Sequence, residues 1–262
     1  MTEIHPSAIV DSKASIGAGT KVGPFAIIES GAKLGKVCLV EGHSVVRGDV
    51  TMGDRNVIGQ GAIIGGDPQD RKYKGETTYL KIGDDNVFRE FVTLHRGTGA
   101  GKSTVIGNNN FLMAFTHVGH NCTIHDNVTI ANSCGISGHV TIEEGVNIGG
   151  MTGVHQFVRI GKYCMIGAMS GVGVDVPPFM LTEGRRCRVY DINAIGLRRL
   201  GYGPDVRMAL HKACKIIYRS ELSMPDAIEK VRAEIQPHPE VDYLLAFIEN
   251  VGEGRYGRQD QK

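Results

Sequence analysis

The chain has 262 residues, with 29 lysine and arginine residues against 28 aspartate and glutamate residues, so its net charge is close to zero. This balance excludes a protein that binds nucleic acid through bulk charge, and the hydrophobic fraction of 41% excludes a disordered chain. No stretch approaches the roughly 20 apolar residues of a transmembrane helix, and the N-terminus lacks the basic and apolar parts of a signal peptide. We expect a cytoplasmic protein without an integral membrane segment, whose six scattered cysteines stay reduced.

A large apolar residue recurs at every sixth position through residues 4–64, 82–94 and 106–172. A period of six fits neither an α-helix nor a flat strand, and it is typical of a parallel β-helix built from hexapeptides. Three hexapeptides, or about 18 residues, make one triangular coil, with the apolar residue inside and small residues at the corners. The 36 glycines and the absence of tryptophan fit so narrow an interior.

Two polar, glycine-containing segments interrupt this period, near residues 66–80 and 96–104. In a solenoid, insertions become loops that are extruded from one face, which is often the binding face. Asp70, Arg71 and Lys72 cluster in the first segment, which favours a binding loop over a tolerated surface insertion.

The pattern becomes helical after Asp191. Helices are expected from Pro204 to about Arg219, after the capping residue Ser223, and from Pro239 onward. The sequence therefore predicts a β-helix domain over residues 1–190 and an α-helical C-terminal domain over residues 191–262. The helices would also cover the unpaired strand edges at the end of the solenoid.

Four histidines fall within a window of five positions of the 18-residue coil, over three successive coils: His117, His120, His139 and His155. Residues one coil apart stack about 4.8 Å from each other, so we expect these histidines to share one edge of the prism. Such a cluster is typical of general acid–base catalysis or metal binding, and a set of exposed surface histidines is the alternative.

A zinc site is the competing interpretation of these histidines. His120 and His125 have a spacing that resembles two ligands of the γ-class carbonic anhydrases. The coil arithmetic places them five positions apart around the prism, and position 84, where a third histidine would be needed, is Asp84. We therefore expect no metal.

Segments distributed over the chain resemble one known family, the UDP-N-acetylglucosamine O-acyltransferases, which catalyse the first step of lipid A biosynthesis. The segments that carry this resemblance are residues 65–76, 89–98, 116–124, 137–142, 148–161 and 175–179. The resemblance implies a left-handed β-helix that forms a homotrimer. It also implies transfer of a 3-hydroxyacyl group from acyl carrier protein to the glucosamine 3-position of UDP-N-acetylglucosamine, with no cofactor.

The same resemblance assigns roles to individual residues. His120 matches the general base, and Gly138, one coil beyond it, matches the donor of a backbone N–H to the oxyanion. Asn121 follows the base where familiar members carry aspartate, and an amide can orient the imidazole but supplies no charge. Ala168 matches the position thought to set acyl-chain length. Residues matching substrate contacts are Gln69, Asp70, Lys72, His117, His139, His155, Gln156, Asn193 and Arg199.

Two other functions remain as alternatives. One is a nucleotide-sugar N-acyltransferase or N-acetyltransferase of the same fold, with a 3-amino acceptor or an acetyl-CoA donor. The other is a non-catalytic scaffold or binding module. The segment Asp67 to Asp70 and the helical tail argue against an acetyltransferase, and the histidine cluster argues against a scaffold. The residues leave open the acyl-chain length and the choice between a hydroxyl and an amine acceptor.

Overall fold

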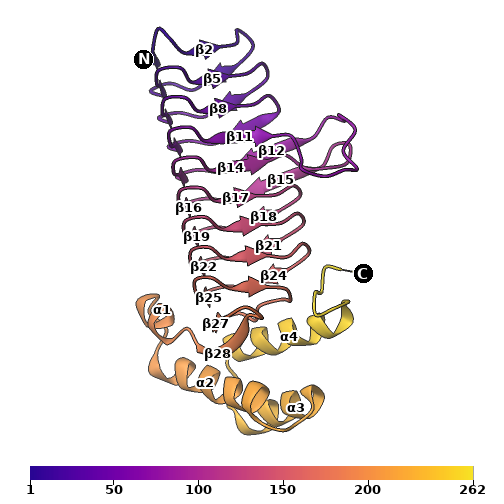
Figure 1. The fold of residues 1–262 in the computed structure, drawn as a ribbon. Helices are drawn as coiled ribbons and strands as arrows, with labels where there is room; N and C mark the ends of the chain where they lie inside the picture. The colour runs from indigo at the N-terminus through magenta and orange to yellow at the C-terminus, as the bar shows by residue number, and fades with distance from the viewer. Residues whose placement is uncertain (262) are drawn as a thin grey trace.

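The computed structural model describes residues 1–261, which form a three-sided prism of stacked coils with helices at its C-terminal end (Figure 1). Each coil supplies one short strand to each of three largely parallel sheets. Sheet A contains β1 (Glu3–Ile4), β4 (Lys21–Val22), β7 (Leu39–Val40), β10 (Val57–Ile58), β13 (Val87–Phe88), β16 (Phe111–Leu112), β19 (Thr129–Ile130), β22 (Asn147–Ile148), β25 (Met165–Ile166), β27 (Met180–Glu183) and β28 (Arg188–Ile192).

The other two sheets close the prism. Sheet B contains β2 (Ile9–Val10), β5 (Ile27–Ile28), β8 (Val45–Val46), β11 (Ile63–Gly66), β14 (Thr93–His95), β17 (His117–Val118), β20 (Gly135–Ile136), β23 (Gly153–Val154) and β26 (Gly171–Val172). Sheet C contains β3 (Ser15–Ile16), β6 (Lys33–Leu34), β9 (Val50–Met52), β12 (Tyr79–Ile82), β15 (Ser103–Ile106), β18 (Thr123–Ile124), β21 (Thr141–Ile142) and β24 (Arg159–Ile160).

The inward residues of the six-residue period form one continuous core, as the sequence predicts. From Val22 to Val172 these residues are buried, and Ile58, Ile130 and Ile136 have no exposed surface. Ile4 in the first coil is the clearest exception, with 48% of its surface exposed, because no coil covers that end of the prism.

Both polar insertions leave the prism between sheet B and sheet C. Strand partners are 18 residues apart in regular coils, as for Thr123 and Thr141, but Ile63 pairs with Thr93 and Thr93 pairs with His117. The extra residues project together as residues 67–78 and 96–102, which we call the first loop and the second loop (Figure 1). Both are shorter than predicted because their ends pair within β12 and β15.

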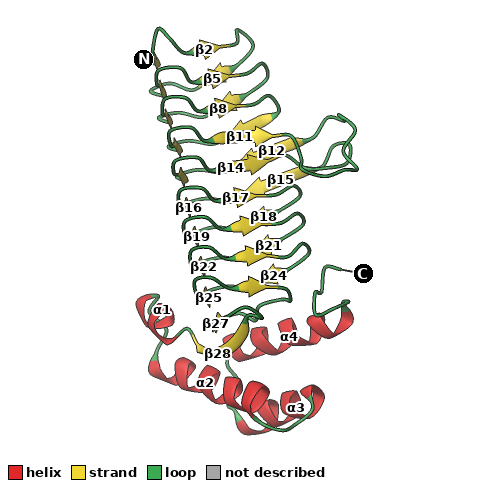
Figure 2. Ribbon diagram, viewed as in Figure 1, coloured by secondary structure: helices red, strands yellow, loops and turns green. Residues whose placement is uncertain are grey.

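Four helices follow the prism, and Figure 2 shows them in red: α1 (Ala194–Arg199), α2 (Pro204–Arg219), α3 (Met224–Glu234) and α4 (Pro239–Glu253). The predicted helix starts at Pro204 and Pro239 are confirmed, as is the Ser223 cap, whose hydroxyl accepts the N–H of Asp226. The sequence did not predict the antiparallel hairpin of β27 and β28, because these strands lack the six-residue period. The domain boundary after residue 190 stays a prediction.

A buried carboxylate joins the helices to the prism. Glu143 is 6% exposed, and it accepts hydrogen bonds from the Tyr243 hydroxyl of α4 and from Nε of Arg159, each at 2.7 Å. Asp175 accepts the main-chain N–H of Gln259 at 2.8 Å and so fastens the C-terminal tail. No helix within residues 1–261 has the length and apolar character needed to cross a membrane.

Two of the three corners of the prism differ strongly in chemistry. The histidine corner joins sheet B to sheet C, and it comprises both loops and residues 119–122, 137–140 and 155–158. The apolar corner joins sheet A to sheet B, and it comprises the turns at residues 23–26, 89–92, 113–116, 131–134, 149–152 and 167–170.

Candidate active site

The predicted histidines lie along the histidine corner and the adjoining edge of sheet B. The rings of His120 and His139 meet edge to face with their centroids 5.2 Å apart, and His139 stacks on Phe157 at 4.8 Å. His117 lies in β17, and His155 lies in the same corner one coil beyond His139. The coil arithmetic therefore predicted the placement of all four histidines.

Asn121 fixes the orientation of the His120 ring. Its Oδ1 lies 2.8 Å from His120 Nδ1 and also accepts the N–H of Thr98 at 2.8 Å. Its Nδ2 donates to the carbonyl of Thr98 at 3.2 Å, which determines which end of the amide is oxygen. Because an amide oxygen only accepts, the network assigns the proton of neutral His120 to Nδ1. The lone pair of Nε2 is then free to accept a proton.

Gly138 lies directly against this imidazole. A Cβ at position 138 would lie 2.6 Å from both Nε2 and Cε1 of His120, so any side chain there would displace the ring. Within residues 1–261, the N–H of Gly138 donates to no protein group. A free backbone donor beside the basic nitrogen suits an oxyanion that forms during acyl transfer.

His95 is a site residue that the sequence analysis did not single out. It is 8% exposed, its ring meets that of His117 edge to face at 4.8 Å, and its Nδ1 has no partner within residues 1–261. The second loop makes strand partners 24 residues apart, so an 18-residue period does not align His95 with the other histidines. The available signal was its position inside segment 89–98, one of those that carry the family resemblance.

Burial keeps His95, His117 and His139 uncharged at neutral pH. Burial, with a smaller contribution from nearby His117, lowers the pKa of His95 to about 4. Burial, followed by the proximity of His120, also lowers the pKa of His117 and of His139. These three rings therefore carry no positive charge at neutral pH in the absence of substrate. Each neutral ring can both donate and accept a hydrogen bond.

The first loop brings charged groups to this corner. The charges of Asp70 and Lys72 act on the pKa of His139 in opposite directions, which places both side chains within electrostatic reach of its ring. Gln69 lies in the same loop and is exposed, as are His155 and Gln156 in their coil. Exposed polar groups along one edge leave room for a polar ligand beside His120.

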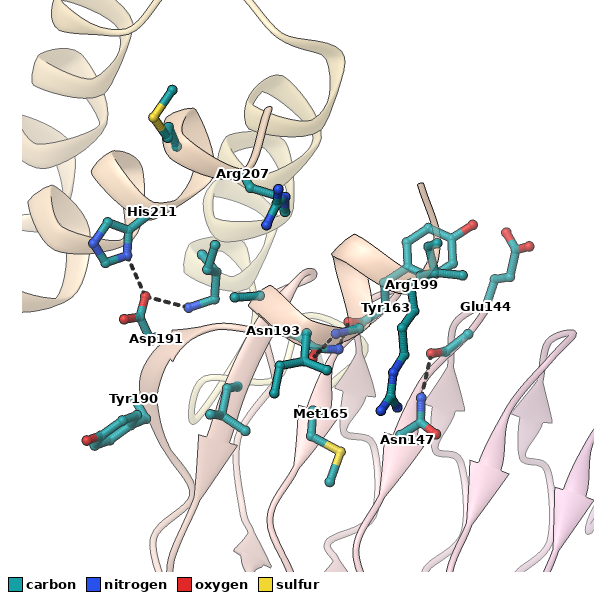
Figure 3. Close-up of a pocket in the computed structure, with 18 of the residues that line it drawn as sticks. Glu144, Asn147, Tyr163, Met165, Tyr190, Asp191, Asn193, Arg199, Arg207 and His211 are labelled. Carbon is teal, nitrogen blue, oxygen red and sulfur yellow. Dashed lines mark hydrogen bonds and ion pairs between the residues drawn. The ribbon is translucent and has the colours of Figure 1, made fainter. Parts of the chain in front are cut away.

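Asn193 and Arg199 do not lie with the histidines of the same chain. Both line a cavity of about 1230 Å³ between α1, α2 and sheet A (Figure 3). Asn193 Oδ1 accepts the N–H of Gly196 at 3.1 Å and caps α1, while its Nδ2 donates to the carbonyl of Tyr163 at 2.9 Å. The turn at Tyr163 joins sheet C to sheet A, so this cavity and the histidine corner lie at different corners of the prism.

Between the histidine corner and the apolar corner, the outer surface of sheet B carries glycine in three successive coils. The outward column that starts at His117 continues in register with Gly135, Gly153 and Gly171. A Cβ at Gly135 or Gly153 would meet nothing within 4 Å, so the absence of side chains leaves a track along the sheet. The track ends at Gly171, where a Cβ would lie 2.6 Å from the carbonyl oxygen of Arg185. Ala168 lies beside this track, exposed in the apolar corner.

The structure places His120 and His125 at different corners. His125 follows β18 in the turn from sheet C to sheet A and is exposed there. Within residues 1–261, no three histidine, cysteine or acidic side chains converge in a group that could hold a metal ion.

Comparisons with known proteins identify the family of this chain. The family described as UDP-N-acetylglucosamine O-acyltransferase, domain 2, matches residues 175–256, and the bacterial transferase hexapeptide family matches residues 103–138. The acyl-[acyl-carrier-protein]–UDP-N-acetylglucosamine O-acyltransferase of Rippkaea orientalis is 51% identical over 258 residues, which span 98% of this chain and 93% of the relative. The enzyme of the same name from Syntrophobacter fumaroxidans is 46% identical over 248 residues, or 94% and 96% of the two chains.

Solved structures agree with these relatives. The UDP-N-acetylglucosamine acyltransferase of Bacteroides fragilis matches with a TM-score of 0.90 and 35% identity, over 94% of this chain and 96% of that one. LpxA of Acinetobacter baumannii matches with a TM-score of 0.88 and 39% identity, over 92% and 95% of the two chains. The expected left-handed parallel β-helix with C-terminal helices is thus confirmed, and the chain belongs to the family of UDP-N-acetylglucosamine O-acyltransferases.

Proposed function

We propose that this enzyme transfers a 3-hydroxyacyl group from acyl carrier protein to the 3-hydroxyl of the glucosamine in UDP-N-acetylglucosamine. The observation that carries this proposal is the arrangement at His120, where an imidazole with a free Nε2 lies against the unbonded N–H of Gly138. A general base and an oxyanion donor side by side are what acyl transfer to a hydroxyl requires. The names of the relatives state the same donor and acceptor.

The reaction follows from these two groups. His120 Nε2 removes the proton of the sugar hydroxyl as its oxygen attacks the thioester carbonyl carbon. The carbonyl oxygen becomes an oxyanion, which accepts a hydrogen bond from the N–H of Gly138. When the tetrahedral intermediate collapses, the new C–O bond remains and the C–S bond breaks. The imidazolium returns its proton to the leaving sulfur, which regenerates the base.

Substrate binding is assigned to the polar groups around this base. Gln69, Asp70 and Lys72 of the first loop contact the nucleotide sugar, and His117, His139, His155 and Gln156 line the same cleft. The proximity of the first loop to His139 supports this assignment. The neutral state of His117 and His139 allows each ring both to donate and to accept, as sugar hydroxyls require.

The active unit is proposed to be a homotrimer with sites between subunits. The apolar corner exposes a column of large apolar side chains, and the exposed fraction of each is between 51% and 67%: Phe25, Phe91, Phe115, Met151 and Met169. A contiguous apolar surface of this kind is typical of a contact between protein chains. Asn193 and Arg199 lie away from the histidines of their own chain and are proposed to contact the nucleotide of a neighbour, where the guanidinium can pair with phosphate.

The donor protein is proposed to dock on a basic surface. Arg185, Arg186 and Arg188 are exposed on the β27–β28 hairpin, and Arg198 is exposed near the end of α1. Acyl carrier protein is acidic, so these residues supply complementary charge despite the near-zero net charge of the chain. The KM for acyl carrier protein should therefore rise steeply between low and moderate salt, and a flat response would contradict docking at this surface.

The test of the proposed function is a donor and acceptor competition read by product mass. The protein is incubated with UDP-N-acetylglucosamine and a set of 3-hydroxyacyl carrier proteins, with acetyl-CoA as the rival donor. A 3-amino analogue of the sugar is the rival acceptor. O-acylated product from the carrier protein supports the proposal, whereas exclusive use of acetyl-CoA or of the amine would contradict it.

Six buried free cysteines support a reducing, cytoplasmic location.

A further inference from the structure

Hydrogen bonds join the two loops at two places. At the start of the second loop, Nη2 of Arg96 donates to Oδ1 of Asp67 at 2.6 Å and to the Tyr73 hydroxyl at 3.2 Å. Glu76 makes the second connection. Oε1 of Glu76, in the first loop, accepts the N–H of Gly99 at 2.9 Å, and the carbonyl of Thr77 accepts the N–H of Gly101 at 2.9 Å. The other carboxylate oxygen of Glu76 accepts the N–H of Lys74 at 2.8 Å. Glu76 thus ties the second loop to the first, and both loops project from the histidine corner (Figure 1).

One peptide group connects Glu76 to the catalytic base. The carbonyl of Thr98 and the N–H of Gly99 are the two ends of a single rigid peptide plane. Its N–H is held by Glu76, and its carbonyl accepts Nδ2 of Asn121 at 3.2 Å. The N–H of Thr98, which belongs to the preceding peptide plane, donates to Oδ1 of the same amide at 2.8 Å. The two peptides that meet at Thr98 therefore determine together which atom of Asn121 faces the His120 ring, and Glu76 holds one of them.

We propose that Glu76 is a positioning residue that selects the reactive tautomer of His120 through the Thr98–Gly99 peptide and Asn121. With the peptide held, Oδ1 of Asn121 faces His120 Nδ1, so the proton stays on Nδ1 and Nε2 is basic. If the peptide rotates, Asn121 can present Nδ2 instead, and the ring must then carry its proton on Nε2, where it cannot act as a base. This inference rests on the proposed function of His120.

The chemistry of Glu76 suits such a holding role. Its main-chain donors, those of Lys74 first and of Gly99 among them, lower its pKa, so the carboxylate stays ionised at any pH at which a neutral imidazole works. An ionised carboxylate accepts stronger hydrogen bonds from N–H groups than a neutral acceptor does.

The decisive experiment is a double-mutant cycle between Glu76 and Asn121. Glu76→Ala should lower kcat by roughly 10-fold to 100-fold, the loss typical of a displaced catalytic group, while KM for UDP-N-acetylglucosamine changes little. In the Asn121→Ala background, Glu76→Ala should cost nothing further, because the amide that it orients is gone. Glu76→Gln keeps one acceptor oxygen and should retain more activity than Glu76→Ala. Losses that add across the cycle would overturn the proposal.

A matched control and a direct observation separate this role from general loop damage. Glu29 lies in the same corner, several coils away, and accepts a main-chain N–H from Gly48 at 3.2 Å, so Glu29→Ala should leave kcat unchanged. A raised KM with unchanged kcat in Glu76→Ala would also overturn the proposal. Imidazole ¹⁵N spectra should show His120 protonated at Nδ1 in the parent and mixed in Glu76→Ala. These spectra need no substrate, so a failure of the acyltransferase assay alone counts against the proposed function and not against this inference.

Discussion

The histidine corner and the apolar corner are built by the same repeat and yet perform different tasks. Both use turns of the same length around the same aliphatic core, as in residues 113–116 and 119–122. One presents titratable rings and two inserted loops, and the other presents exposed phenylalanine and methionine side chains, such as Phe91 and Phe115, stacked at 5.2 Å. The hexapeptide repeat therefore determines the residues of the core. The side chains at the corners can vary, so one corner can hold reactive groups and another can form contacts between chains.

The largest effect is expected from removing the proposed base, His120, at the histidine corner. His120→Ala should lower turnover by about 10²–10⁴-fold, the usual contribution of a positioned general base, while the fold remains because the side chain lies outside the core. His125→Ala, at the corner between sheets C and A, should be nearly silent. Steady-state assays of both variants test this prediction, and equal losses would show that corner position does not decide function.

The second prediction concerns the stability of the histidine corner in acid. The pKa of His95 falls from an ordinary 6.5 to about 4 on folding. Above pH 6.5 neither state binds the proton, whereas below it the unfolded chain binds it first, so stability is lost as the pH falls from 6.5 to 4. The shift corresponds to about 3 kcal/mol. Denaturant unfolding at several pH values should show this loss in the parent chain.

His95→Gln removes the titrating ring and should flatten that part of the pH profile. His125→Gln is the matched control, since it replaces an exposed histidine at another corner and should leave the profile unchanged. An equally steep loss of stability in His95→Gln would mean that other groups cause the acid sensitivity.

The contrast between the corners also shows what the sequence could predict. Each inward residue is specified within its own hexapeptide, so the core from Val22 to Val172 could be assigned residue by residue. Contacts that depend on the inserted loops could not be assigned. The strand register of His95 and the hydrogen bond from Thr98 to Asn121 depend on how many residues each loop adds to its coil. The β27–β28 hairpin has no period to reveal it.

The third prediction tests the apolar corner. Phe115→Asp should weaken assembly of the chain by on the order of 100-fold in dissociation constant, because a phenylalanine contributes roughly 2–3 kcal/mol when buried. The side chain is 60% exposed in one chain, so folding should be unaffected. Light scattering over a dilution series measures the change. Leu222→Asp, at an exposed apolar position between α2 and α3, is the control, and assembly equal to that of the parent in Phe115→Asp would exclude this corner as the interface.

The smallest effect is expected where the track on sheet B reaches the apolar corner. Ala168 lies just under three coils from His120, or roughly 13 Å along the prism, which accommodates on the order of ten carbons of an extended acyl chain. Ala168→Met should fill the end of the track beside Gly153 and shift the preferred donor several-fold toward shorter chains. Ala168→Gly should shift it the other way, and neither change touches the core, because Ala168 is exposed. Competition among ten-, twelve- and fourteen-carbon 3-hydroxyacyl carrier proteins, read by product mass, measures both shifts. If both variants rank the three donors as the parent does, the acyl chain does not end at Ala168 and the apolar corner serves assembly alone.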